Sequence, residues 1–386
     1  MSWALLLQPH DVLLFRDGKP FAAGADTRAR SLFPPTPFTV QGAIRARMLF
    51  SSEVRPHDYV FNGSDPQVQK LREKIGFMSQ NYGQLQLRGP FLVKKANEHN
   101  GQWVRYFPLP ADIVKNKNDE SYRVLQPLRS AILLSNLPAV ESLLWVTGVN
   151  RFDEAQGWIS EAGLGLYLQG QAPQKAHIEP EQEFIVRESR FGIALQLGKR
   201  TVQEGFLYTA EFLRFKDRVA LWLEVEGLTP NDLGQEKGFL QLGGEARVAY
   251  YECVESRPLP TLNGSLPERF KVVLLTPAWF EQGWRPSDWQ PFFTGSVHLI
   301  TAMIPRYQSL GGAYVDDQRR RTNFQKPIRR FVPAGSVYYF ERKGDATYTG
   351  KPFTETPAGE GDYGQIGFGC AVIGQWDYCP GGNHHV

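Results

Sequence analysis

Two apolar patterns near the start of the chain predict a strand and, after a polar loop, a helix. The run from Trp3 to Leu7 is typical of a buried strand. Further on, apolar residues recur at the spacing of a buried helical stripe: Val40, Ile44 and Met48. Thr36 and Pro37 begin this helix, because a threonine oxygen caps the first turn and a proline at the first helical position loses no hydrogen bond.

The remaining pattern mixes strands with short helices and predicts an α+β protein. Further helices are expected at residues 67–75 and 152–159. Strands are expected at residues 84–93, 102–107, 164–168, 219–225, 247–253, 270–275, 337–340 and 368–373. The polar segment from Gly170 to Glu183 contains two prolines and is typical of a domain boundary. We therefore expect two domains, residues 1–175 and 176–386, since a single core rarely exceeds about 300 residues.

Composition narrows the class of protein. The formal net charge of the 386 residues is +3, which is too small for a protein coated with nucleic-acid contacts, so any such site must be local. Three cysteines are too few and too scattered for a disulfide framework: Cys253, Cys370 and Cys379. No apolar run approaches the roughly 20 residues of a membrane span, and the first segment lacks the basic region of a signal peptide. We expect a cytoplasmic protein.

The segment from Val12 to Arg47 is the main candidate for a functional site. It carries six cations in a loop rich in glycine and proline and in the helix that follows: Arg16, Lys19, Arg28, Arg30, Arg45 and Arg47. Together with the free N–H groups of the helix start, these cations favour binding of a phosphate. A solvated surface loop is the alternative. Arg45 and Arg47 lie about 200° apart on the helix, so one site is expected to use only one of them. Gly42 is expected where another backbone or a ligand comes close.

A second basic segment, residues 319–330, contains no acid. Its cations are Arg319, Arg320, Arg321, Lys326, Arg329 and Arg330, and its one aromatic residue is Phe324. Cations beside an aromatic ring suit a single-stranded nucleic acid, whose phosphates need charge and whose bases need a stacking surface. A flexible charged loop is the alternative.

Other chemical motifs are weak. The glycines of residues 364–376 resemble a dinucleotide fingerprint but lack the βαβ unit that such a site requires, so they form a turn or let an RNA backbone pass close. No metal or cofactor is expected, because the candidate ligands lack the spacing of a metal site: Cys370, Cys379, His384 and His385. His10 and the pair Asp316-Asp317 are the candidates for RNA cleavage.

Five separated segments, in order, resemble the third subunit of the Cmr complex, a RAMP-superfamily protein of type III-B CRISPR effectors. They are LLFRDGKPF, RARSLFPPTPFTVQGAIRAR, FGIALQLGKRTVQEGFLYTAEFLR, LGGEARVAYYE and GQIGFG. The resemblance is weakest from Ser51 to Gly148. It implies two ferredoxin-like, RRM-related domains with insertions, a C-terminal glycine-rich loop and no catalytic activity.

The resemblance also implies a function in CRISPR antiviral defence. Such subunits hold the 5′ repeat-derived tag of the guide RNA (crRNA), contact the large polymerase-like subunit and the repeated backbone RAMP subunit, and meet target RNA indirectly. The residues implied to bind RNA are Arg16, Lys19, Arg28, Arg30, Ser31, Thr39 and Arg45 in the N-terminal motif and Gly364, Gly367 and Gly369 in the glycine-rich loop. The cations of residues 319–330 are added from the sequence pattern alone. Two alternatives stay open: a repeat-cleaving endoribonuclease of the same superfamily, and a scaffold that binds an acidic protein partner.

Overall fold

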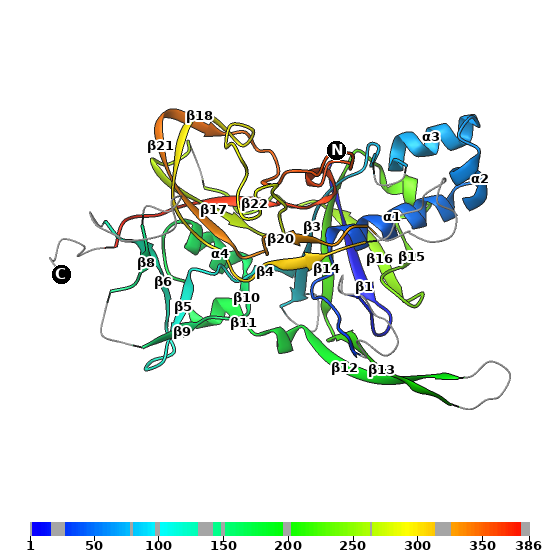
Figure 1. Cartoon of the computed structure of the whole chain (residues 1–386), viewed down its shortest axis with the longest axis horizontal. Helices are drawn as coiled ribbons and strands as arrows, with labels where there is room; N and C mark the ends of the chain where they lie inside the picture. Colours follow the sequence, from blue (N-terminus) through cyan, green and yellow to red (C-terminus); the bar gives the residue numbers. More distant parts are fainter. Residues whose placement is uncertain are drawn as a thin grey trace.

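The computed structural model describes residues 2–16, 28–77, 80–96, 101–129, 142–147, 151–195, 202–262, 265–312 and 326–379 (Figure 1). Over these residues the chain is rich in strands and has few helices, in agreement with the mixed α and β class expected from the pattern. The helices are α1 (Pro37–Ser51), α2 (Pro56–Phe61), α3 (Pro66–Ile75) and α4 (Glu161–Leu168). Across the same ranges, no helix is both long and apolar enough to span a bilayer.

Eight antiparallel strands form the largest sheet. Their order is β11 (Ile178–Glu179), β10 (Trp158–Ser160), β4 (Trp103–Pro108), β3 (Gln86–Lys95), β14 (Val219–Glu226), β1 (Trp3–Pro9), β16 (Val248–Glu255) and β15 (Lys237–Gln241). The first strand, β1, lies between β14 and β16, so that Leu5 is opposite both Leu223 and Cys253. The boundary expected between residues 175 and 176 runs through this sheet, because β14, β15 and β16 follow it in the chain while β1, β3 and β4 precede it.

Helix α1 packs on this sheet through the apolar stripe that its sequence predicts. Its stripe residues are buried in one core cluster with β1 and β14: Val40, Ile44 and Met48. At the helix start, the Thr36 hydroxyl accepts a hydrogen bond from the Thr39 N–H at 3.4 Å, and Pro37 occupies the first turn. The helix start predicted at Thr36 and Pro37 is therefore confirmed.

A second antiparallel sheet follows in the chain. Its order is β18 (Phe293–Met303), β21 (Val337–Tyr348), β17 (Arg269–Leu274) and β22 (Ala371–Gln375). The strand order β18-β21-β17-β22 places the second, third, first and fourth strands of the group side by side, and β3-β14-β1-β16 in the large sheet has the same order. The chain therefore passes from the first group of four strands to the second between Glu255 and Arg269.

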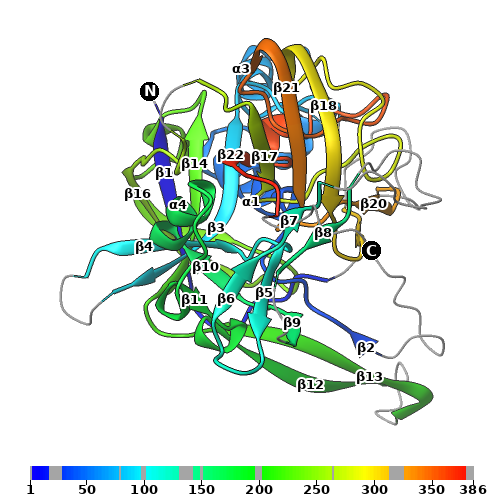
Figure 2. The same cartoon turned by 90° about the vertical axis from the view of Figure 1, so that its left-hand side faces the viewer.

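A long two-stranded ribbon extends from the body of the molecule (Figure 2). It consists of β12 (Ile185–Leu195) and β13 (Val202–Phe215), and β2 (Arg28–Ala29) pairs in parallel with Thr209 and Ala210 of β13. Smaller sheets are formed by β5 (Ile113–Asn116), β6 (Tyr122–Val124) and β9 (Phe152–Glu154), by β7 (Gln126–Pro127) and β8 (Leu144–Trp145), and by β19 (Gln308–Leu310) and β20 (Arg329–Phe331).

Two elements expected from the sequence are wrong. Residues 152–159, expected as a helix, form β9 and β10, because residues 158–160 pair with residues 106–108 of β4. Residues 164–168, expected as a strand, belong to α4, whose first turn is capped by the Ser160 hydroxyl accepting from the Gly163 N–H at 3.3 Å. In the first case pairing with a distant strand outweighed the local pattern.

A buried ionic cluster joins the second sheet to α4 and to the loop before β5. Asp112 accepts hydrogen bonds from the hydroxyl of Tyr167 at 2.7 Å and from that of Tyr339 at 2.5 Å. Lys271 Nζ lies 3.6 Å from Asp112 Oδ2, and burial lowers the pKa of Lys271 to about 8. Each of the four residues is at most 1% exposed. Because a buried charge is costly without a partner, the cluster holds these elements in fixed positions.

The C-terminal glycines lie inside the fold. Gly364, Gly367 and Gly369 are buried around the short turn η4 (Gly364–Ile366). Gly367 has a φ of 106°, and a Cβ at this position would lie 2.5 Å from the carbonyl oxygen of Gly89 on β3. Close packing of this loop on β3 therefore accounts for the glycine at position 367.

We predict that Asp112→Asn lowers the free energy of unfolding by about 3 kcal/mol at pH 7, because the charge of Lys271 is left buried without its partner. Replacing Lys271 by methionine in the same protein should restore much of the loss. Urea unfolding followed by tryptophan fluorescence measures both variants. A double variant no more stable than Asp112→Asn alone would contradict the prediction.

We predict that Gly367→Ala lowers the free energy of unfolding by at least about 2 kcal/mol, because a strained φ and the contact with the Gly89 oxygen act together. Gly344→Ala is the matched control, since Gly344 has a φ of 66° but nothing lies within 4 Å of its Cβ. The control should cost only about 1 kcal/mol. Equal losses in the two variants, measured by the same unfolding assay, would show that the contact with β3 does not matter.

Candidate nucleic-acid interface

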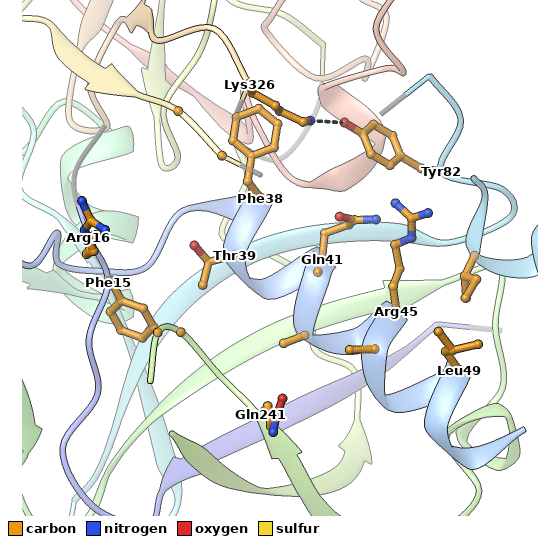
Figure 3. Close-up of a pocket in the computed structure, with 18 of the residues that line it drawn as sticks. Phe15, Arg16, Phe38, Thr39, Gln41, Arg45, Leu49, Tyr82, Gln241 and Lys326 are labelled. Carbon is orange, nitrogen blue, oxygen red and sulfur yellow. Dashed lines mark hydrogen bonds between the residues drawn. The ribbon is translucent and has the colours of Figure 1, made fainter. Parts of the chain in front are cut away.

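Helix α1 forms one wall of a cavity of about 760 Å³, here called the α1 cavity (Figure 3). Its other walls come from residues 14–16 after β1, helix α2, the segment that leads into β3 and the turn after β15. Its described lining contains three cations, Arg16, Arg45 and Lys326, and no acid. Most of the other lining side chains are apolar, which strengthens the field of each cation inside the cavity.

Two polar side chains of α1 face the cavity one helical turn apart. Arg45 is half-buried and donates from Nη2 to the Tyr59 hydroxyl at 3.1 Å. Gln41 is only 5% exposed, and its Nε2 has no hydrogen-bond partner. Figure 3 shows both side chains directed toward Tyr82. Their common direction follows from their spacing, since residues four apart lie on the same helix face.

The structure agrees with the expectation for Arg47 but shows no close backbone at Gly42. The guanidinium carbon of Arg47 lies 5.5 Å from the centre of the Tyr251 ring, and this residue does not line the cavity. The expected separation of Arg45 and Arg47 is therefore present. Gly42 lines the cavity and is exposed, but a Cβ there would meet no atom within 4 Å. Within the described ranges, no backbone of this chain comes close to Gly42.

Arg16 and Thr39 line the cavity, whereas Ser31 does not line it but holds the segment that carries Arg16. Ser31 is 5% exposed and forms a backbone bridge with Arg16. Its hydroxyl donates to the Glu211 carbonyl at 2.6 Å and accepts from the Phe15 N–H at 3.2 Å. Ser31 therefore holds the segment that carries Arg16 against the ribbon.

The other N-terminal cations of the motif are not brought to the cavity. Arg30 is exposed and lies outside its lining. Arg28 pairs through its backbone with Thr209 of β13, and its side chain is not among those described. Lys19 lies outside the described residues. Contacts of these three residues with RNA stay predictions.

Lys326 closes the cavity next to Phe38. Its Nζ lies 4.2 Å from the centre of the Phe38 ring and donates to the Tyr82 hydroxyl at 3.4 Å. Burial lowers the pKa of Lys326 to about 8, while the Glu360 carboxylate, 4.0 Å away, acts in the opposite direction. A lysine held by these contacts forms part of the wall.

Of the other cations in the second basic segment, only Arg329 and Arg330 are described, and they have different surroundings. Arg329 donates to Glu360 Oε1 at 2.9 Å, and its guanidinium carbon lies 5.6 Å from the centre of the Trp279 ring. Arg330 is exposed and lies over the ring of Tyr307 at 4.8 Å. Arg319, Arg320 and Arg321 lie outside the described residues. The buried glycines Gly364, Gly367 and Gly369 do not line the cavity, and their contact with RNA also stays a prediction.

Of the candidates for RNA cleavage, only His10 is described, and it does not line the α1 cavity. His10 is exposed at the end of β1, with its ring edge-on to Phe239 at 6.3 Å. Asp316 and Asp317 lie outside the described residues. Where side chains are described, no three His, Cys, Asp or Glu residues gather as a metal site would require.

The sequence interpretation missed Gln41, Phe38 and Tyr82. Gln41 has a usable signal, since it lies one turn before Arg45 on the helix that was predicted. Tyr82 meets Lys326 across 244 positions of the chain, and no local pattern marks such a contact.

Among the solved structures to which the chain is similar are two of CRISPR complexes. One is a chain in the cryo-EM structure of the type III-B Cmr-beta bound to cognate target RNA and AMPPnP, with 18% identity, a TM-score of 0.47, and coverage of 87% of this chain and 86% of that chain. The other is a chain in the crystal structure of the Csm3–Csm4 subcomplex of the type III-A interference complex, with 13% identity, a TM-score of 0.34, and coverage of 90% and 96%. No curated protein sequence matches the chain.

The family comparison covers nearly the whole chain. The family model described as CRISPR-associated protein (Cas_Cmr3) matches residues 5–376, which include α1, the described walls of its cavity and, apart from the first two residues of β1, both groups of four strands. The match agrees with the five segments that carry the resemblance in the sequence. The chain therefore belongs to the Cmr3 family of CRISPR-associated proteins.

Proposed function

We propose that this chain is a non-catalytic RNA-binding subunit of a type III-B CRISPR effector complex and that the α1 cavity holds the 5′ repeat-derived tag of the guide RNA. One observation carries the proposal. Three residues of the N-terminal motif, Arg16, Thr39 and Arg45, converge with Lys326 on a single cavity whose described lining contains no acid.

The chemistry of the cavity suits a single-stranded RNA end. The first turn of α1 reaches the cavity through Phe38 and Thr39, and the positive end of a helix favours a phosphate. Aromatic side chains line the same space, among them Phe15 and Tyr82. Unpaired bases stack on aromatic rings, and cations neutralise backbone phosphates. The cavity therefore offers contacts for both the base and the phosphate of a nucleotide.

The proposed partners are the guide RNA, the large polymerase-like subunit and the repeated backbone subunit. The ribbon of β12 and β13 supports contact with another chain, because Phe191 is 77% exposed and Ile193 is 49% exposed. Large apolar side chains exposed together are typical of interaction surfaces.

The strand order supports derivation of both halves from ferredoxin-like units. A β-α-β-β-α-β unit supplies four strands and two helical crossovers. In the first group, α1 occupies the crossover between β1 and β3, and the short turn η3 (Pro230–Leu233) lies between β14 and β16. In the second group, η4 lies between β21 and β22. The second crossover thus contains no α-helix in either group, and the crossover between β17 and β18 contains none either.

A comparison of tagged and untagged guides tests the function. The full chain, reconstituted with its partner subunits, should bind a fluorescent guide RNA carrying the 5′ tag at least about 10-fold more tightly than one lacking it, since several phosphate and base contacts are lost together. Fluorescence anisotropy measures both affinities. Equal affinities would sink the proposed role in holding the tag.

The salt dependence of binding tests the role of Arg45. Arg45→Ala should weaken guide binding and reduce the slope of log K against log salt by about 0.7, the value for one phosphate contact on a single strand. Arg47→Ala is the matched control on the same helix and should leave the slope unchanged, because Arg47 packs against Tyr251. If Arg45→Ala also leaves the slope unchanged, Arg45 has a structural role only.

A further inference from the structure

The amide of Gln41 is the most unusual polar group of the α1 cavity. Gln41 is 5% exposed and lines the cavity, yet its Nε2 has no hydrogen-bond partner. Buried amide groups are nearly always paired, because an unpaired donor loses its hydration without compensation. The structure therefore holds a hydrogen-bonding group at the cavity wall that the protein itself does not use.

The neighbouring Arg45 determines which end of this amide faces the cavity. Figure 3 shows Gln41 Nε2 on the side of Arg45, whose guanidinium has donors only. Rotation of the amide about its last bond keeps the shape of the side chain and exchanges oxygen for nitrogen. This rotation puts the acceptor Oε1 on the side of the Arg45 donors and turns the N–H groups toward the cavity. Gln41 is then a donor for whatever enters.

The surroundings of Gln41 favour a flat, aromatic ligand that is linked to an anion. Phe38 and Tyr82 supply rings at this end of the cavity, and Figure 3 shows Gln41 and Arg45 directed toward Tyr82. The cations supply charge for a phosphate, and no described lining residue is acidic. An acidic side chain of a protein would satisfy the cations but would leave the rings and the amide without partners. A nucleotide of a single strand satisfies all three.

We propose that the α1 cavity takes one unstacked base of the guide tag and that Gln41 reads this base by donating from Nε2 to an acceptor on its edge. Gln41 is thus the specificity-determining residue, whereas Arg45 binds backbone phosphate and fixes the orientation of the amide. This inference rests on the proposed function and adds to it the ligand of the cavity, a single nucleobase, and the group that discriminates among bases.

A double-variant cycle between protein and RNA tests the inference. The full chain in its reconstituted complex is measured with guide RNAs in which each tag position in turn is made abasic. One abasic position should weaken binding about 10-fold or more, because a stacked and hydrogen-bonded base is lost. Gln41→Leu, which keeps the size of the side chain but removes the donor, should weaken binding of the intact guide about 3- to 10-fold. Combined, the two changes should cost no more than the abasic change alone.

Two further variants keep the test clear of folding effects. Gln69→Leu removes an exposed glutamine of α3 that does not line the cavity, and it should change guide affinity by less than about 2-fold. Gln41→Glu keeps a polar side chain but offers acceptors only, so it should weaken binding at least as much as Gln41→Leu. Thermal unfolding of each variant establishes that the protein is folded.

Each outcome decides between the hypotheses. Tag-dependent binding that is weakened by Arg45→Ala, but without coupling between Gln41 and any tag position, overturns the base-reading role alone. Equal affinity for tagged and untagged guides overturns the proposed function and this inference with it. If Gln41→Leu leaves RNA affinity unchanged and instead weakens binding of a partner subunit, the occupant is a protein side chain and the inference is wrong.

Discussion

The packing of α1 on the eight-stranded sheet decides where the side chains of the site lie. Val40, Ile44 and Met48 are buried against the sheet, and at about 100° per residue this fixes the direction of every other side chain of the helix. Arg45 points about 140° away from Val40 and so reaches the cavity. Arg47 returns to within about 20° of Val40, because seven residues make nearly two turns, and it lies against Tyr251. One apolar stripe therefore selects between two neighbouring arginines.

The opposite wall of the cavity depends on contacts between segments that are far apart in the chain. Glu360 accepts hydrogen bonds from Arg329 at 2.9 Å and from the Tyr363 hydroxyl at 2.6 Å, and its charge also lies near Lys326. Lys326 in turn reaches Tyr82, which precedes β3. These contacts join the residues after β19 to the segment before η4 and to the segment before β3. The same carboxylate thus pairs with two of the cations that the sequence assigns to RNA, Lys326 and Arg329.

The sequence predicted most individual helices and strands but few of the pairings between them. The strand at β1, the capped start of α1 and its buried stripe were correct because each depends on neighbouring residues. Residues 152–159 were assigned wrongly because β10 exists by pairing with β4, some 50 residues earlier, and no periodicity shows which strand will be its neighbour. For the same reason, the expected boundary at residue 175 did not anticipate that β14 and β16 flank β1. A polar, proline-containing segment indicates a loop, but a loop separates domains only if no strand pairs across it.

The sequence also revealed only some of the residues of the candidate site. Arg16, Thr39 and Arg45 could be found because cations and helix starts have recognisable patterns, whereas the importance of Gln41 depends on a missing partner, which only the packed structure reveals. Cations bind the backbone of any RNA and mainly supply affinity. Discrimination among bases requires a directional group that faces a base edge, and a neutral amide in a helix has no distinctive sequence signal. The residues that are easiest to recognise in the sequence are therefore the ones that say least about which RNA is selected.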